Sequence, residues 1–319
     1  MKAVFLRELG SLSVEDIPVP EPKANEVQIK IEINTLCNST DGEIIHGHRS
    51  HEMDVIMGHE SCGTVSKVGS LVTKFAVGDR VTMDYWGSFA EFMCTPEELV
   101  LPVPDELSWE EAALSELTYK VLHMSLGQIW PGDTAVVLGQ GPAGLLYTQV
   151  CRLSGASNIV VTDPSPMKRA LALEQGAHAA IDSNDPDRAE KVMEATGGRG
   201  GDIVIEASGR AAAAELAPFV TKAYGARIIQ FGVVPETARY TFMHMHDKGQ
   251  TLLSYGSFKD RTNRFSFERA LQLLAEKKID VSKFITDTYP LSRINEAVAR
   301  YEGDVDNVIK IKIVNKEKI

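Results

Sequence analysis

A glycine-rich motif near the middle of the chain constrains the fold more than any other feature. The residues Gly139-Gln140-Gly141-Pro142-Ala143-Gly144 form the pattern GxGxxG, follow the apolar run Ala135–Leu138 and open a helical stretch that reaches about Leu153. In this setting the first glycine permits a tight turn, the second lets the backbone approach a pyrophosphate, and the third lets the helix pack closely on the strand. The helix N-terminus then offers free N–H groups to the phosphates. The motif therefore predicts a dinucleotide-binding strand–turn–helix unit.

An acidic residue follows this motif at a suitable distance. Asp163 ends the next predicted strand, 19 residues after Gly144. A carboxylate there accepts hydrogen bonds from the adenosine ribose hydroxyls and repels a 2′-phosphate, which favours NAD over NADP. Lys168 and Arg169 weaken this preference, because a nearby base can admit the phosphate. The alternative interpretation is that Asp163 only starts the loop with Pro164.

Apolar runs alternate with helix-length segments from Thr134 to about Phe258. The predicted strands are Thr134–Leu138, Ile159–Thr162, Ala179–Ile181, Ile203–Glu206, Arg227–Phe231 and Thr251–Tyr255. This alternation predicts right-handed βαβ units and a parallel sheet. We therefore expect residues 121–257 to form a dinucleotide-binding domain, inserted into a second domain made of residues 1–120 and 258–319.

The second domain is expected to be rich in strands. Apolar and polar residues alternate over Val27–Ile33, which predicts a half-buried strand. Ser108, followed by two glutamates, predicts the start of a helix that continues to about Gly127. A helix over Ser266–Lys277 and two strand-like segments are expected to close the chain.

Composition disfavours several classes of partner and location. The 319 residues include 33 lysines and arginines and 44 aspartates and glutamates, a formal net charge of −11. Nucleic acids and anionic membranes need clustered basic residues, and here the only dense cluster is the tail, interpreted as a solvated strand end. The lysines of that cluster are Lys310, Lys312, Lys316 and Lys318. No membrane helix or signal peptide is expected. The four cysteines form no CxxC pair, which favours a reducing, cytoplasmic compartment.

Three features of the first domain suggest a metal site. Cys37 follows the strand Val27–Ile33, the segment Gly58-His59-Glu60 comes 21 residues later, and Glu116 lies on the predicted helix. Cysteine, histidine and carboxylate together suit zinc, and three protein ligands with an open position suit a catalytic ion. Taken singly, each residue has an ordinary explanation as a core cysteine, a hydrogen-bonded histidine or a helix-capping glutamate. Their spacing alone does not decide between these interpretations.

Over essentially its whole length the chain resembles the medium-chain zinc-dependent alcohol and polyol dehydrogenases. The matching segments, in order, are Met1–Val4, Cys37 with Asp41, Gly58-His59-Glu60, Gly78–Val81, Gly139–Gly144 and Gly225–Arg227. The resemblance implies an α/β fold in which a doubly wound, parallel Rossmann sheet is inserted into a β-rich, GroES-like catalytic domain. It also implies a homodimer or homotetramer that acts on a small alcohol or its carbonyl compound.

The resemblance implies that Cys37 and His59 bind one catalytic zinc ion per subunit. Glu60 is then either a direct ligand or a neighbour of the ligands. Glu116 falls where one branch of the family has a cysteine ligand and the polyol and threonine branch has a glutamate. Asp41 matches the acid that orients the zinc-bound histidine.

The resemblance also assigns residues to the dinucleotide. Lys168 and Ser208 join the glycine motif and Asp163 in this site. Backbone groups of Phe231-Gly232-Val233 and of Tyr255-Gly256-Ser257 are implied to hold the nicotinamide carboxamide.

The sequence departs from the family pattern near Cys37. The spacing from Cys37 to Asp41 is one residue longer than usual, so either Ser39 or Thr40 could accept the substrate's proton. Glu43 stands where the family often has a histidine, which leaves the outer proton route open.

A further departure from the family pattern and an unusual cluster of histidines lie in the same domain. The lobe with four cysteines and a structural zinc is missing, because the chain goes directly from Val81 to Trp86. Three histidines, His46, His48 and His51, cluster in the loop before Gly58. They are interpreted as part of a solvated loop, with a pocket wall or a pH-sensitive proton path as the alternative.

The implied chemistry is zinc-assisted hydride transfer. Zinc would lower the pKa of the substrate alcohol, Ser39 or Thr40 would accept its proton, and NAD would accept the hydride. One alternative is a zinc-free quinone or enone reductase that uses NAD(P)H on the same fold. Another is a dinucleotide-binding module without catalysis. The sequence does not distinguish a polyol, a sugar, an amino alcohol or a simple alcohol as the substrate.

Overall fold

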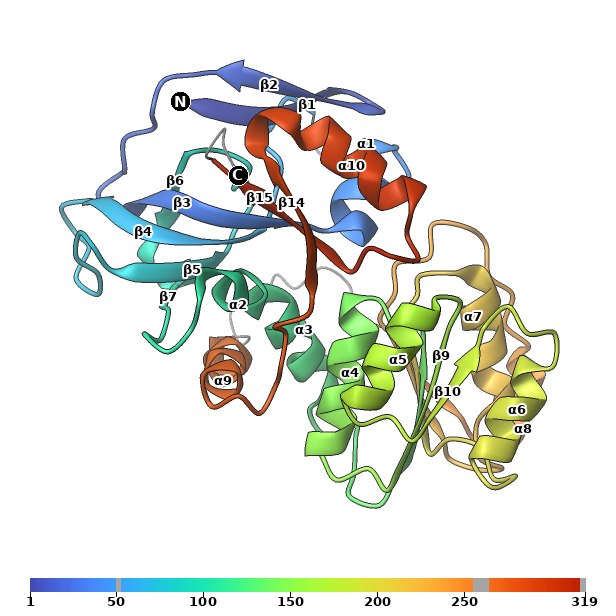
Figure 1. Cartoon of the computed structure of the whole chain (residues 1–319). Coiled ribbons are helices and arrows are strands. Elements are labelled where there is room, and N and C mark those ends of the chain that lie inside the picture. Colours follow the sequence, from blue (N-terminus) through green and yellow to red (C-terminus); the bar gives the residue numbers. More distant parts are fainter. Residues whose placement is uncertain (50–52, 255–263, 316–319) are drawn as a thin grey trace. The chain divides into compact units, whose positions relative to one another are not determined.

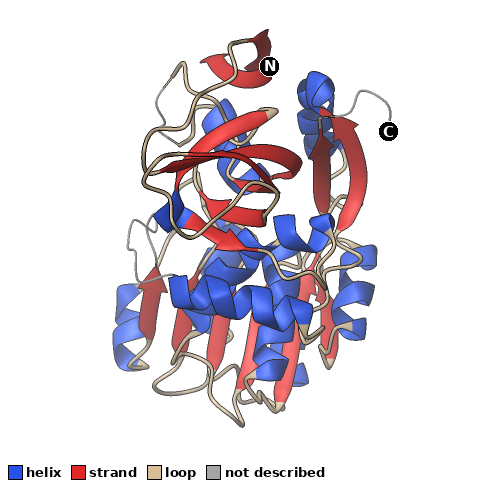
Figure 2. Ribbon diagram, turned by 90° about the vertical axis from the view of Figure 1, so that its left-hand side faces the viewer, coloured by secondary structure: helices blue, strands red, loops and turns tan. Residues whose placement is uncertain are grey.

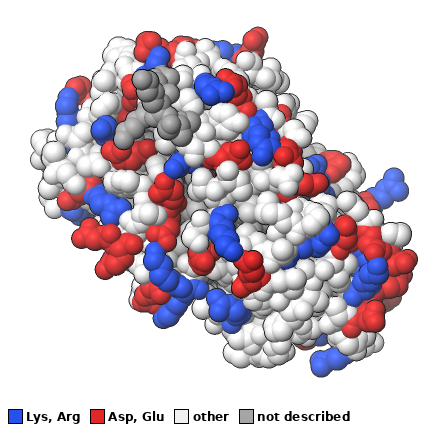
Figure 3. All heavy atoms as spheres, in the orientation of Figure 1, with Lys and Arg blue, Asp and Glu red and all other residues white. Residues whose placement is uncertain are grey.

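The computed structural model describes residues 1–49, 53–254 and 264–315. The chain divides into two compact units, Met1–Tyr119 with Phe267–Ile319, and Lys120–Ser266. The sequence placed the second boundary at residues 257/258, which lie outside the described residues. None of the described helices combines the length and apolar character needed to cross a lipid bilayer. Basic and acidic side chains are interspersed on the face of the molecule that Figure 3 shows.

The unit Lys120–Ser266 is built on a six-stranded parallel sheet (Figures 1 and 2). Its strands are β8 (Thr134–Leu138), β9 (Asn158–Asp163), β10 (Ala179–Asp182), β11 (Ile203–Glu206), β12 (Arg227–Gln230) and β13 (Thr251–Ser254). They lie in the order β10-β9-β8-β11-β12-β13, and every pair is parallel. This is the Rossmann order, so the predicted fold class is confirmed, and the order reverses between β8 and β11. Ligands of such sheets bind beyond the carboxyl ends of the strands at that point.

Helices connect these strands and bury the sheet. They are α4 (Pro142–Leu153), α5 (Pro166–Glu174), α6 (Arg188–Ala195), α7 (Ala211–Leu216), the short 3₁₀ turn η3 (Ala217–Phe219) and α8 (Phe242–Asp247). The core packs strand residues such as Val136, Val160 and Val204 against helix residues such as Val192 and Met245. Strands buried on both faces need near-continuous apolar runs, which explains why the sequence showed them so clearly.

The other unit contains a seven-stranded sheet and a separate hairpin. The sheet is formed by β3 (Glu26–Leu36), β4 (Glu60–Val68), β5 (Arg80–Asp84), β6 (Phe92–Pro96), β7 (Val100–Pro102), β14 (Ile285–Pro290) and β15 (Lys310–Val314). Its order is β14-β15-β3-β4-β5-β7, with β6 also paired to β3. The hairpin consists of β1 (Lys2–Glu8) and β2 (Ser11–Asp16). Because β15 pairs with β3, strands from both ends of the chain meet in one sheet.

Short helices surround this sheet. They are the π-helical turn η1 (Asn38–Gly42), α1 (Glu43–Ile45), η2 (Glu97–Leu99), α2 (Trp109–Ala113), α3 (Ser115–Ser125, whose later part enters the other unit), α9 (Arg264–Ala275), η5 (Leu291–Arg293) and α10 (Ile294–Gly303). Ser108 caps α2 as expected, in a reciprocal capping box with Glu111. The prediction of one continuous helix to Gly127 is wrong. The helix is interrupted at Leu114, where the Ser115 hydroxyl donates to the Ala112 carbonyl and competes with the helical hydrogen bonds.

Candidate active site

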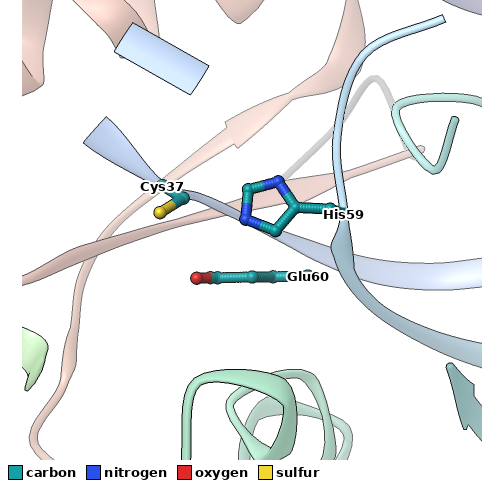
Figure 4. A group of neighbouring side chains, drawn as sticks. All are labelled: Cys37, His59 and Glu60. Carbon is teal, nitrogen blue, oxygen red and sulfur yellow. The ribbon is translucent and has the colours of Figure 1, made fainter. Parts of the chain in front are cut away.

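Three buried side chains meet where β3 ends and β4 begins. Cys37 follows β3, His59 precedes β4, and Glu60 is the first residue of β4. The two strands are antiparallel neighbours, which brings the end of one beside the start of the other. The cysteine sulfur, a histidine nitrogen and a glutamate oxygen all lie within 4.8 Å of one another. Figure 4 shows these atoms turned toward the same space.

The π-helical turn after Cys37 accommodates the long spacing to Asp41. A π-helix holds one residue more per hydrogen-bonded loop than an α-helix, and such turns often occur at functional sites. Asp41 is fully buried, its Oδ2 accepts the Cys37 N–H at 3.1 Å, and its Oδ1 lies 3.3 Å from His59 Nδ1. The Asp41 carboxylate therefore holds the imidazole with its other nitrogen toward Cys37, in the way that a metal-bound histidine is usually held.

The electrostatics of this group attract positive charge. Burial acts to lower the pKa of His59, but the charges of Asp41 and Cys37 outweigh it and raise that pKa well above its usual value. Burial acts to raise the pKa of Glu60, but the Lys310 ammonium outweighs it and keeps that pKa below its usual value. The imidazole thus lies beside a buried carboxylate, in a setting that favours a bound proton or metal ion.

Lys310 forms a buried ion pair with Glu60, which corrects the interpretation of the basic tail. Its Nζ donates to Glu60 Oε2 at 2.5 Å and to the Leu36 carbonyl at 3.4 Å, and the Thr35 hydroxyl donates to the same carboxylate oxygen. Only 2% of the Lys310 side chain is exposed. The interpretation as a solvated strand end is wrong for Lys310, because β15 pairs with the inner strand β3.

The other tail lysines differ in their setting. Lys312 pairs with Glu110 at 2.8 Å, while Lys316 and Lys318 lie outside the described residues. The signal that could have identified Lys310 is its place inside an otherwise apolar run, Val308–Ile311.

The environment of the second carboxylate oxygen of Glu60 supports Glu60 as a metal ligand. Oε1 is buried and accepts no hydrogen bond from the described part of the chain. An ionised oxygen in that state is costly unless a cation or donor satisfies it. Together, thiolate sulfur, imidazole nitrogen and carboxylate oxygen are a donor set that zinc accepts. The residues present therefore fit a zinc ion.

The residues that the sequence left as alternatives lie at different distances from Cys37. Glu116 is buried on α3 but is not a member of the group formed by Cys37, His59 and Glu60. Ser39 Oγ lies 3.6 Å from the Cys37 sulfur, and no comparable contact is found for Thr40 among the described residues.

The Trp86 side chain lies against the group, whereas the described contacts of the loop histidines are with other residues. The Trp86 ring lies against the His59 imidazole, with their centroids 4.7 Å apart. His46 and His48 are exposed and contact Glu302 and Glu43 at 2.6 and 2.8 Å. His51 lies outside the described residues.

The glycine motif adopts the geometry expected of a dinucleotide loop. Gly139 has φ of +92°, and a Cβ there would lie only 2.6 Å from Ser208 Cβ. A Cβ at Gly144 would overlap the Gly139 carbonyl oxygen, whereas one at Gly141 would meet nothing within 4 Å. The open position at Gly141 is where a pyrophosphate would approach the backbone. Pro142 begins α4, where its fixed φ suits a helix start.

Asp163 is tied directly to this loop. It ends β9, its Oδ2 accepts the Gln140 N–H at 2.6 Å, and its Oδ1 accepts the Ser165 N–H at 2.9 Å. The carboxylate therefore shapes the loop as well as marking the end of the strand, a role that the sequence did not indicate. Lys168 is buried on the following helix, α5.

The remaining predicted cofactor residues lie at the ends of neighbouring strands. Ser208 follows β11, and Phe231-Gly232-Val233 follows β12, with the Phe231 ring edge-on to Tyr147. Tyr255-Gly256-Ser257 lies outside the described residues.

Comparison with known proteins gives consistent matches. The model of an alcohol dehydrogenase GroES-like domain matches residues 23–105, and that of a zinc-binding dehydrogenase matches residues 142–276. Sorbitol dehydrogenase from Bacillus subtilis (strain 168) is 28% identical over 98% of this chain and 97% of that protein. L-threonine 3-dehydrogenase from Rhizobium rhizogenes is 32% identical over 65% of this chain and 68% of that protein. The structure of 2R,3R-butanediol dehydrogenase from Bacillus subtilis superposes with a TM-score of 0.88 at 25% identity, covering 99% of both chains.

Proposed function

Because this chain belongs to the medium-chain, zinc-type alcohol and polyol dehydrogenases, we propose that it oxidises a secondary alcohol with a neighbouring hydroxyl or amino group, using NAD. It is an oxidoreductase that uses zinc and a nicotinamide dinucleotide to transfer a hydride between an alcohol and its carbonyl compound. The buried group of Cys37, His59 and Glu60 carries the proposal. A zinc-free quinone or enone reductase, or a module without catalysis, would have no use for it.

Each residue near the group has a distinct task in this proposal. Cys37, His59 and Glu60 would hold the zinc ion, while Asp41 orients the imidazole and Lys310 orients the glutamate. When bound there, zinc supplies Lewis-acid chemistry, which lowers the pKa of a substrate hydroxyl. We assign acceptance of the substrate's proton to the Ser39 hydroxyl, because it contacts the Cys37 sulfur.

The sulfur ligand can be tested with a matched pair of variants. Cys37→Ser should lose zinc and most turnover while still binding NADH, since the dinucleotide loop belongs to other strands. Cys94→Ser removes a half-buried cysteine from β6 and should keep both zinc and turnover. Zinc content, alcohol oxidation and NADH fluorescence are measured on the same samples. Normal turnover in metal-free Cys37→Ser protein would contradict the proposal.

The substrate class follows from what the named relatives act on. Sorbitol, xylulose, 2R,3R-butanediol and threonine each carry an oxygen or nitrogen on the carbon beside the one that is oxidised or reduced. The test is NAD⁺ reduction with sorbitol, xylitol, 2R,3R-butanediol and L-threonine, with 2-propanol as the matched secondary alcohol without a neighbouring group. Equal kcat/KM for 2-propanol and the best of the others would refute this class.

The NAD preference rests on Asp163. A carboxylate at the end of β9 disfavours the 2′-phosphate of NADP, although Lys168 follows five residues later. A relative from Sinorhizobium meliloti 1021, 27% identical over 98% of both chains with a TM-score of 0.88, has NADP bound in its solved structure. The ratio of kcat/KM for NAD and NADP decides the matter, and a higher value for NADP would overturn the preference.

We also propose a homodimer formed through β13. Within the described residues β13 pairs only with β12, so it is an edge of the sheet, and Leu252 on it is partly exposed. Phe242 and Met243, on the preceding helix α8, are 75% and 70% exposed. An exposed edge strand can pair with its two-fold-related copy. Light scattering should give twice the chain mass for the parent protein and a lower mass for Leu252→Lys; a parent monomer would refute this surface.

A cytoplasmic location is proposed as well. The four cysteines are free thiols, which is typical of a reducing compartment. Fractionation of cells that produce the protein would test this, and recovery with an oxidising compartment would contradict it.

A further inference from the structure

A buried carboxylate that the proposed mechanism does not use lies at the end of β11. The Glu206 side chain is fully buried. Its Oε1 accepts hydrogen bonds from the Ser208 N–H at 2.8 Å, the Gly209 N–H at 3.0 Å and the Ser208 hydroxyl at 2.5 Å. Its Oε2 accepts one from Gln230 Nε2 at 2.6 Å. All four partners are neutral donors, so the geometry is that of an ionised carboxylate held by dipoles.

These hydrogen bonds connect two loops at the carboxyl end of the sheet. Ser208 and Gly209 follow β11, whereas Gln230 ends β12 and leads into Gly232. The Glu206 carbonyl accepts the N–H groups of both Phe231 and Gly232, at 2.9 and 3.0 Å. A Cβ at Gly232 would overlap Glu206 Oε2, so the second loop lies directly on the carboxylate.

The Glu206 carboxylate is also connected to the glycine motif, through Ser208. Ser208, which it holds by two hydrogen bonds, packs against Gly139 so closely that any side chain at Gly139 would collide with it. Strands β8 and β11 are the neighbours between which the strand order reverses. Glu206 therefore fixes the relative positions of three loops at the point where sheets of this kind bind dinucleotides.

The negative charge of the Glu206 carboxylate distinguishes this arrangement from neutral packing. Burial raises the pKa of Glu206 above its usual value, although the hydrogen bonds from Ser208, Gln230 and Gly209 act to lower it. A buried anion is costly, and the glutamine of equal shape would avoid that cost. Glutamine cannot replace it in function, however, because its amide N–H₂ would face another donor at either oxygen position.

We propose that Glu206 is a positioning residue for the nicotinamide dinucleotide: its carboxylate holds the loops after β11 and β12 in the conformation that binds the cofactor. This inference rests on the proposed use of a nicotinamide dinucleotide. Glu206 acts through Ser208 and Gly232, and it takes no part in moving the hydride or the proton. Its loss should therefore raise the KM for NAD much more than it lowers kcat.

The test compares two variants with the parent zinc-loaded enzyme. Glu206→Gln is expected to weaken NADH binding about tenfold, the effect of losing a hydrogen bond to a charged group, with kcat at saturating NAD changed less than about threefold. The double variant Glu206→Gln/Gln230→Glu restores one negative charge and one matched donor–acceptor pair. It loses the hydrogen bond from Gln230 Nε2 to the Gly232 carbonyl at 2.9 Å, so it should recover part of the lost affinity. NADH fluorescence titration, zinc content and the thermal midpoint are measured for all three proteins.

The possible results distinguish failure of the Glu206 positioning role from failure of the proposed function. NADH affinity of Glu206→Gln within about twofold of the parent would overturn the positioning role. A loss that the double variant does not recover would also overturn it, in favour of a purely structural role. If Glu206→Gln does not fold, Gln230→Leu removes the donor to Oε2 from the other side and should weaken NADH binding; parent-like affinity would then refute the role. If the parent itself binds neither NADH nor NADPH, the proposed function fails instead.

Discussion

Replacing Lys310 with methionine tests the charge balance beneath the candidate zinc site. Lys310 and Glu60 lie 2.5 Å apart, with 2% and 1% of their side chains exposed. At an effective dielectric constant of about 20, two unit charges at this separation attract by about 7 kcal/mol, part of which is offset by the burial of both charges. Removing one partner of a buried pair costs about 3–5 kcal/mol, because the other charge stays buried. We expect Lys310→Met to lower the unfolding free energy of zinc-free protein by that amount.

A neighbouring lysine supplies the matched control. Lys312 lies two residues further along the same strand and pairs with Glu110 at 2.8 Å, but 20% and 42% of these side chains are exposed. Lys312→Met should therefore cost at most about 1 kcal/mol. Urea unfolding of both variants, followed by circular dichroism, gives the two values under identical conditions.

Zinc provides a second, independent comparison. A bound cation would place positive charge beside Glu60 and replace part of what Lys310 contributes. The cost of Lys310→Met should therefore be smaller in zinc-saturated protein than in zinc-free protein, and adding Glu60→Gln should recover part of the lost stability. The reasoning is refuted if Lys310→Met costs no more than Lys312→Met in the absence of zinc.

Three further predictions follow from the described geometry. Gly141→Ala should fold normally yet lose NADH affinity, because its methyl group enters the space left for the cofactor. Gly144→Ala should lower the thermal midpoint as well, because its methyl group would overlap the Gly139 carbonyl oxygen. Equal NADH binding by the parent and Gly141→Ala would contradict this prediction. Ser39→Ala should lower kcat roughly 100-fold with zinc retained and Thr40→Ala should not, and the reverse result in the same assay would reassign the proton acceptor. Because the pKa of Glu206 is raised, the folded protein keeps this proton at pH values where the unfolded chain has lost it, so parent stability should fall as pH rises from the usual glutamate range through the raised pKa. Urea unfolding across that range should show a shallower fall for Glu206→Gln, and identical slopes would argue against a raised pKa.

Features that depend on neighbouring residues were predictable from the sequence. Strands β8 and β11 have the predicted bounds, and α4 begins and ends as expected. Apolar runs, glycine spacing and proline at the helix start act within a few residues, so their meaning does not depend on distant parts of the chain. Resemblance to a family added Cys37 and His59, which spacing alone could not distinguish from a core cysteine and a loop histidine.

Features that depend on which strands become neighbours were decided by the tertiary structure. The burial of Lys310 and its pairing with Glu60 join residues 250 positions apart, through the pairing of β15 with β3. The same holds for the placement of Glu60 beside Cys37 and His59, and for the contacts of Glu206 with Gln230. A charged residue in a strand has the same local pattern whether it faces water or an opposite charge. Its environment is therefore set by strand order and register, which only long-range packing determines.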